Sequence, residues 1–94
     1  MTLLHMKLTC LGPEIFDNEY LANMKGTDEL EFACNRAMES ATDLQQMLQL
    51  RVEMTVLTLR LRELGTPPHG YSFLLHLIGD LQLKIATRKL STKP

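Results

Sequence analysis

The run from Thr27 to Gly65 constrains the fold more than any other stretch, because no proline and no glycine interrupts it before Gly65. Apolar residues recur along it in steps of three and four, which is the spacing of one face of an α-helix. Small residues dominate the first half of this pattern and bulky ones the second half, and the two stripes change register near residues 47–50. We predict one long helix over residues 28–64, which is too apolar to be stable without a packing neighbour.

The start of the predicted helix carries capping signals. Asp28 followed by Glu31 has the spacing of a capping box, and Thr27 is an alternative cap. A rival interpretation is a β-strand, since apolar and polar residues also alternate from Leu50 to Val56. A strand of about 16 residues would far exceed the usual length of about five or six. The helix is therefore favoured.

The segment from Gly65 to Gly70 contains two adjacent prolines, and a residue that precedes proline avoids helical geometry. The long helix must stop there, and a second helix over residues 71–90 should turn back antiparallel to it. The apolar residues of this second helix follow heptad-like steps: Tyr71, Leu74, Leu75, Ile78, Leu81 and Ile85. The pair Gly79-Asp80 leaves one alternative open, a hairpin turn between two short strands.

The N-terminal region is expected to be an attachment to this hairpin. Residues 2–11 alternate apolar and polar side chains, which is typical of an extended segment. Pro13 suits the first position of a short helix over residues 13–25, and Gly26 suits a left-handed cap that ends it. The whole chain, residues 1–94, is therefore expected to form one all-α domain, an antiparallel helical hairpin with a short N-terminal helix and an extended N-terminus.

The charge and the reactive side chains argue against several classes of function. The net charge is −1, so neither nucleic acid nor an anionic membrane surface would attract the chain. No apolar run approaches the roughly 20 residues of a membrane span. The three histidines and two cysteines lack the paired spacing of structural zinc sites. We expect no metal, no cofactor and no enzymatic activity, and we expect Cys10 and Cys34 to be reduced thiols in a cytoplasmic protein.

Two helices cannot cover all the apolar residues of this chain. Six apolar residues lie outside the regularly spaced apolar stripes, or main seams, of the two predicted helices: Leu48, Val52, Val56, Leu59, Leu77 and Leu83. Exposed apolar surface of this kind marks a site for a protein partner. We predict a non-enzymatic chaperone or adaptor that binds a partner's helix through its apolar seam, with these partner-binding residues: Met47, Leu50, Met54, Leu57, Leu61, Leu64, Tyr71, Leu74, Leu75, Ile78, Leu81 and Ile85.

Two other interpretations remain open. The same hairpin would form a homodimeric four-helix bundle with a structural or regulatory role. If the strand alternatives were correct, the chain would be an α+β DNA-binding or regulatory domain.

The stretch RLRELGTPPHGYSFLLHLIGDLQLKIATRKL resembles the small YscE-like co-chaperones of type III secretion needle subunits. Members of that family are helical hairpins whose second helix opens with a Pro-x-x-Tyr-like turn. Here Pro67 or Pro68 precedes Tyr71, and Phe73, Leu74, Ile78 and Ile85 follow at matching places. The resemblance covers about residues 45–90, while the N-terminal 26 residues are longer than the family leads us to expect. It implies pairing with a helical-repeat co-chaperone, so that the two proteins keep a needle subunit monomeric before export.

Overall fold

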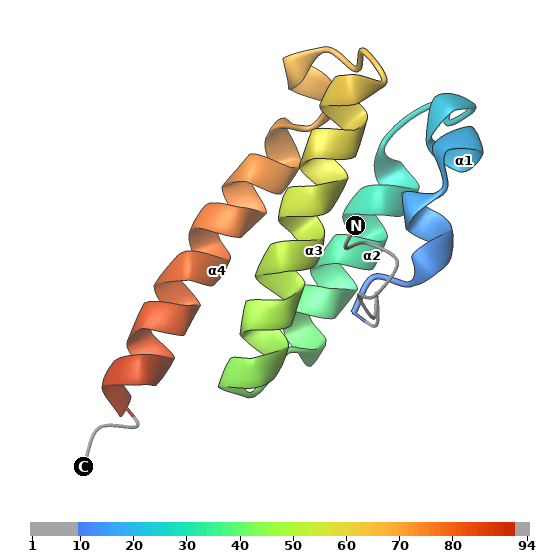
Figure 1. Ribbon diagram of the computed structural model, residues 1–94. Helices are drawn as coiled ribbons and strands as arrows, with labels where there is room; N and C mark the ends of the chain where they lie inside the picture. Colours follow the sequence, from blue (N-terminus) through green and yellow to red (C-terminus); the bar gives the residue numbers. More distant parts are fainter. Residues whose placement is uncertain (1–9, 92–94) are drawn as a thin grey trace.

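The computed structural model describes residues 10–91, and in this range the chain is all-α (Figure 1). Its elements in order are the 3₁₀ turn η2 (Pro13–Phe16), α1 (Asn18–Ala22), α2 (Asp28–Ser40), α3 (Leu44–Glu63), the 3₁₀ turn η3 (Pro68–Gly70) and α4 (Ser72–Ser91). Helices α3 and α4 pack antiparallel along their length, α2 lies beside α3, and the N-terminal elements lie on the side away from α4 (Figure 1). The predicted all-α hairpin is confirmed, and the strand alternatives for residues 48–64 and 72–88 are wrong.

The turn between α3 and α4 follows from the glycine and prolines after Glu63. Gly65 adopts a φ of +86°, which an L side chain rarely tolerates. The Gly65 N–H donates to the carbonyl of Arg62, and the Thr66 N–H donates to that of Leu61, each at 3.0 Å. This pair of bonds is a Schellman motif, which satisfies the last carbonyls of α3. Pro67 and Pro68 then start the turn η3, from which α4 runs back along α3.

The predicted single helix over residues 28–64 is wrong in one respect, because the chain leaves helical geometry at Ala41 and restarts at Leu44. The reason is local hydrogen bonding by Asp43 and Gln46. The Gln46 N–H donates to Asp43 Oδ1 at 2.8 Å, and Gln46 Oε1 accepts from the backbone N–H groups of Asp43 and Thr42. The capping box therefore lies at Asp43, and α2 and α3 run side by side in opposite directions (Figure 1).

The start of α2 also differs from the prediction. Thr27 occupies the N-cap position but makes no side-chain bond to the backbone of the first turn. Its hydroxyl instead donates to Glu31 Oε2 at 2.7 Å. The predicted capping box of Asp28 with Glu31 is therefore not formed.

The predicted helix over residues 13–25 is also divided. Asp17 separates η2 from α1 and caps α1, since its Oδ2 accepts from the Tyr20 N–H at 2.9 Å. Helix α1 ends at Ala22, and Gly26 is not left-handed. Of the predicted extended segment, residues 2–9 lie outside the described residues.

Side chains tie these N-terminal elements to the helices. The guanidinium of Arg60 donates to the carbonyl of Phe16 and to Asn18 Oδ1, the latter at 2.9 Å. The Tyr20 hydroxyl donates to Glu29 Oε1 at 2.7 Å, and this bond is the main reason that the pKa of Tyr20 is raised. The N-terminal region is thus bound to both α2 and α3.

The core lies where α2, α3, α4 and the N-terminal segment meet. It is mainly aliphatic, with Phe16 and Tyr71 as its two aromatic members, which agrees with an aromatic content of only 5%. Its buried apolar members are Leu11, Ile15, Phe16, Leu21, Leu30, Cys34, Ala37, Ala41, Met47, Leu50, Met54, Leu57, Leu61, Tyr71, Leu74, Leu81 and Ile85.

Candidate functional site

Most of the predicted partner-binding residues lie in the interior of the chain. Nine of the twelve are buried: Met47, Leu50, Met54, Leu57, Leu61, Tyr71, Leu74, Leu81 and Ile85. Ile78 is half-buried, whereas Leu64 and Leu75 are exposed. The contacts of the nine buried residues are made within the chain, with the rest of the core. A role for them in partner binding stays a prediction.

The large apolar side chains that remain exposed on α4 share one face. Leu75, Leu83 and Leu90 are 54%, 70% and 72% exposed. Gly79 and Ala86 lie between them in the sequence, so that the five residues follow steps of four, four, three and four. This spacing places them on one side of a helix, and a Cβ added at Gly79 would meet only open space. We call these five residues the outer stripe of α4.

Helix α3 carries a second apolar stripe. Val52 is 43% exposed and Leu59 is 50% exposed, while Leu48 and Val56 are half-buried. These four residues follow steps of four, four and three, which again is one face of a helix. We call them the outer stripe of α3. The predicted exposure of Val52 and Leu59 is confirmed, whereas Leu48 and Val56 are partly buried against the core.

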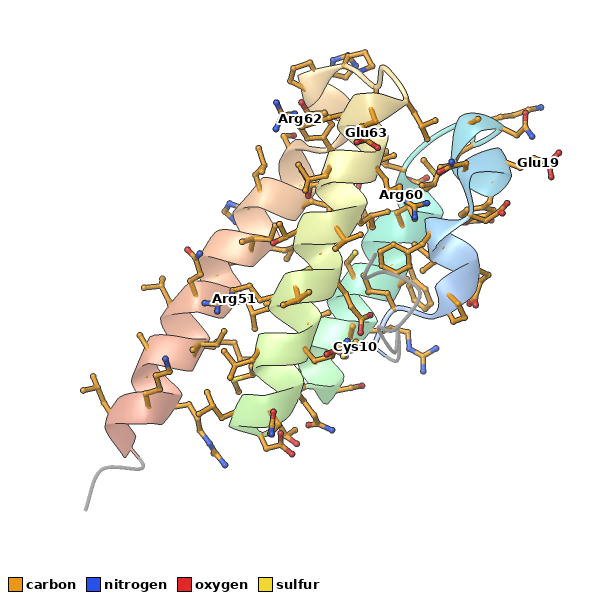
Figure 2. The ribbon with its side chains drawn as sticks, in the orientation of Figure 1. Cys10, Glu19, Arg51, Arg60, Arg62 and Glu63 are labelled. Carbon is orange, nitrogen blue, oxygen red and sulfur yellow. The ribbon has the colours of Figure 1, made fainter. Side chains whose placement is uncertain are left out.

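A groove joins α3 and α4 near the middle of the two helices. Arg51, Val52, Thr55 and Val56 line it from α3, and Gln82 lines it from α4, around a volume of about 280 Å³. Figure 2 shows Arg51 on the side of α3 that adjoins α4. We call this depression the outer groove. It combines two valines of the α3 outer stripe with a guanidinium, an amide and a hydroxyl.

Among the described residues, Arg51 is the only charged one that lines the outer groove. Arg51 and Arg62 are eleven residues apart, about three helical turns, so they lie on the same face of α3. Within residues 10–91, the only ion pair joins His76 and Asp80 of α4 at 3.6 Å. Neither arginine is therefore neutralised by a carboxylate of the described chain.

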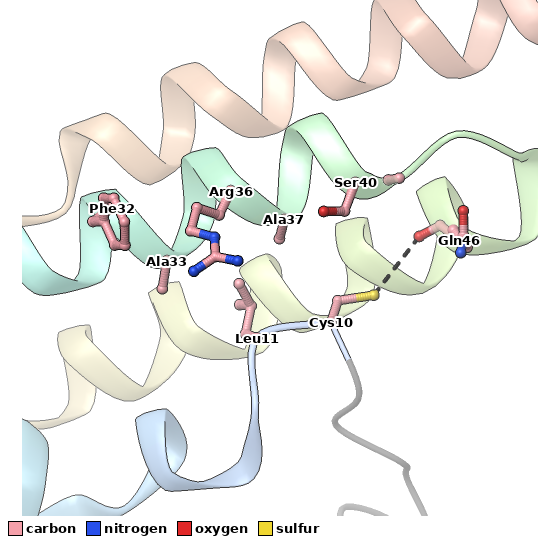
Figure 3. A pocket seen from close by; sticks show the side chains of 9 residues that line it. Cys10, Leu11, Phe32, Ala33, Arg36, Ala37, Ser40 and Gln46 are labelled. Atoms are coloured by element: carbon pink, nitrogen blue, oxygen red, sulfur yellow. Dashed lines mark hydrogen bonds between the residues drawn. The ribbon is translucent and has the colours of Figure 1, made fainter.

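A larger hollow of about 540 Å³ lies between α2 and the segment at Cys10 and Leu11 (Figure 3). The Arg36 guanidinium there lies over the Phe32 ring, 5.7 Å from its centroid. The Cys10 thiol points to the carbonyl of Gln46, with 3.9 Å between sulfur and oxygen (Figure 3). None of the described residues that line this hollow is a histidine or a carboxylate that would serve as a catalytic base for the thiol.

Glu53 is a buried carboxylate that sequence analysis missed. Its side chain is fully buried, and its oxygens accept hydrogen bonds from the backbone N–H groups of Cys10 and Leu11 and from Gln49 Nε2. The distances to Leu11 N and Gln49 Nε2 are 2.9 and 2.6 Å. A signal was present, because Glu53 stands three residues after Leu50 and four before Leu57, in the buried pattern of α3.

The Cys34 thiol and the possible metal ligands show no arrangement for catalysis or metal binding in the described residues. Cys34 is buried in the core, and burial together with the nearby charge of Glu31 raises its pKa to about 12. A thiol with a raised pKa is a poor nucleophile at neutral pH. Among residues 10–91, no group of three histidine, cysteine or acidic side chains is arranged to hold a metal ion. The absence of enzymatic activity stays a prediction.

Comparison with known proteins finds no family model, no curated protein and no solved structure that matches this chain. Over the described residues, no helix has both the length and the apolar character needed to cross a membrane. The chain is thus a small all-helical protein with exposed apolar stripes on α3 and α4.

Proposed function

We propose that the protein is a non-enzymatic adaptor or chaperone that binds a helix of a partner protein on the outer stripes of α3 and α4. The observation that carries this proposal is the exposure of five large aliphatic side chains on these two helices: Val52, Leu59, Leu75, Leu83 and Leu90. An apolar face of this kind loses contact with water when a partner's amphipathic helix covers it. Each side chain that becomes covered contributes on the order of 1 kcal/mol before the entropy costs of association.

The resemblance to needle-subunit co-chaperones gives the proposal a specific form. In that form, the hairpin of α3 and α4 binds a helical-repeat co-chaperone, and the pair keeps a needle subunit monomeric. The support is the resemblance itself and the Pro-led turn at Pro68, which precedes the buried Tyr71. Co-expression with each of the two proposed partner types tests this form directly.

The proposal is tested by comparing partners that co-purify with the wild-type chain and with two variants. Leu59→Asp places a charge in the outer stripe of α3. Phe32→Asp is the matched control, since Phe32 is 64% exposed but lies on α2 at the other hollow. We expect mass spectrometry to find a protein that wild type and Phe32→Asp retain in equal amounts and that Leu59→Asp loses.

Retention of every partner by Leu59→Asp would contradict the proposal, provided that circular dichroism shows the variant to be folded. Light scattering separates the homodimeric alternative. A dimer that Leu59→Asp converts to a monomer would assign the same face to a second copy of this chain.

A further inference from the structure

The chemistry of the outer groove carries information about what binds there. Its walls are aliphatic at Val52 and Val56, but its polar lining groups are the guanidinium of Arg51, the amide of Gln82 and the hydroxyl of Thr55. The Thr55 hydroxyl already donates to the carbonyl of Arg51 at 2.8 Å. The charge that the groove offers to an occupant is therefore positive.

This positive charge extends along α3. Arg62 lies on the same face as Arg51, about 16 Å further along the helix axis. From α4, the residue that lines the outer groove is Gln82, whose side chain carries no charge. Each guanidinium can donate two parallel hydrogen bonds to a carboxylate, so two carboxylates about 16 Å apart on a bound helix would each have one arginine partner.

Two other occupants fit this face less well. A second copy of the chain would bring its own Arg51 and Arg62 toward the same two cations, and like charges at an interface disfavour association. A nucleic acid would meet aliphatic stripes that contain no aromatic ring for base stacking. An acidic, amphipathic helix satisfies both the apolar stripes and the two arginines.

We infer that the outer groove binds an amphipathic helix of another protein whose apolar face is flanked by carboxylates, about three turns apart, that pair with Arg51 and Arg62. This inference rests on the proposed function and adds the charge of the partner. In this inference, the outer stripes provide most of the affinity for the partner helix, and the two arginines provide the preference for an acidic helix over a neutral or basic one.

The test uses three labelled synthetic helices that share one leucine stripe. They carry Glu, Gln or Lys at two flanking positions eleven residues apart. Fluorescence anisotropy measures their affinity for the wild-type chain, for the double variant Arg51→Glu/Arg62→Glu, and for Arg36→Glu. Arg36 is the matched control, because it is an exposed arginine on α2 at the other hollow.

We expect wild type and Arg36→Glu to bind the Glu helix about five- to tenfold more tightly than the Gln helix, and the Lys helix least. The double variant should reverse this order. Added salt should weaken binding of the Glu helix and leave that of the Gln helix nearly unchanged, because salt screens exposed charge pairs.

Equal affinity for the three helices would overturn the inference and leave the proposed function intact. Failure of wild type to bind any of them would also overturn it, while the proposed function is judged separately by the loss of a co-purifying partner in Leu59→Asp. Two further results would overturn it in favour of another occupant: tighter binding of a thymidine oligonucleotide than of the Glu helix, or a dimer that Arg51→Glu strengthens.

Discussion

Glu53 joins the N-terminal segment to α3 through a single buried carboxylate. Its oxygens accept from the N–H groups of Cys10 and Leu11, which precede Gly12 and Pro13. Backbone donors that enter a core need acceptors, because a buried donor without one destabilises the fold by about 1–3 kcal/mol. Glu53 therefore lets the chain approach α3 closely at a place where it has no helix to satisfy its own backbone.

Replacing this carboxylate gives a clear expectation for stability. In Glu53→Gln, an amide N–H₂ takes the place of one accepting oxygen and faces backbone donors. We expect the free energy of unfolding to fall by about 1–3 kcal/mol, measured by urea denaturation. The control is Glu63→Gln, at an exposed position of α3, which should change it by less than about 0.5 kcal/mol. Equal losses in the two variants would show that the bonds of Glu53 contribute little.

Cys34 predicts a dependence of stability on alkaline pH. Its pKa is about 12 in the folded chain against 9.0 for a free thiol, chiefly because of burial. The folded state therefore holds this proton more tightly than the unfolded state does. The contribution of Cys34 is fully present below pH 9 and is lost as pH rises toward 12.

The measurement is the free energy of unfolding at a series of pH values above 9, for wild type and for Cys34→Ala. We expect the wild-type value to fall more steeply with pH, because only wild type has this thiol to ionise on unfolding. The absolute stability of Cys34→Ala is not the readout, since removing the side chain also changes packing. Parallel curves for the two proteins would contradict the expectation.

At the scale of elements, the break between α2 and α3 gives the bundle its third helix. The capping box of Asp43 and Gln46 restarts the helix after a reversal, so that α2 packs back against α3 instead of extending beyond it. Without this reversal, Leu30, Cys34 and Ala37 would have no core to enter. Three short polar side chains around the break, Ser40, Thr42 and Asp43, are poor helix-interior residues, because they compete for backbone hydrogen bonds.

Removal of the cap tests this element. Asp43→Ala loses the side-chain acceptor for the Gln46 N–H, and we expect a destabilisation of about 1 kcal/mol in thermal or urea unfolding. Asp28→Ala is the matched control, since Asp28 begins α2 but is exposed and makes no capping bond. A loss in Asp28→Ala as large as in Asp43→Ala would mean that charge near a helix start, not the cap geometry, is responsible.

At the scale of the whole molecule, the exposed fraction of each side chain distinguishes residues of α3 that stabilise the core from residues of α3 that are free to bind a partner. Leu57 is 0% exposed and Leu59 is 50% exposed, although both are leucines of α3. The sequence alone marks Leu57 as a partner contact, but its side chain is already packed against the core. An aspartate at Leu57 would bury an unpaired charge, whereas one at Leu59 would remain in water.

The same substitution should therefore unfold the chain at Leu57 and leave it folded at Leu59. We expect Leu57→Asp to lose most of its helical signal in far-UV circular dichroism at 25 °C. Leu59→Asp should keep that signal and a free energy of unfolding within about 0.5 kcal/mol of wild type, yet lose binding to the partner or to the Glu helix. A folded Leu57→Asp variant that lacks partner binding would instead support the predicted role of Leu57.

Much of the fold follows from patterns that act over short distances. The spacing of leucine and methionine in the second half of the Thr27–Gly65 run predicts a helix because one face repeats every three or four residues. Pro67 and Pro68 predict its end, because they block helical geometry in the residue before them. The exposed stripe of α3 was also predictable, since Val52 and Leu59 stand outside the main seam.

Other features depend on contacts between residues that are far apart in the chain. The register change near residues 47–50 was visible in the sequence, but these residues lie inside α3, and the break between the two helices is at Ala41–Asp43. The spacing of Glu53 within the apolar pattern of α3 indicates burial, but its backbone partners could not be predicted, because they lie 42 and 43 residues away in the chain. The sequence by itself determined that the chain is helical and that it turns at residues 65–70. The tertiary structure decided which apolar face is interior, because two helices with more than one apolar side can be packed in several ways, and only α2 and the N-terminal segment select among them.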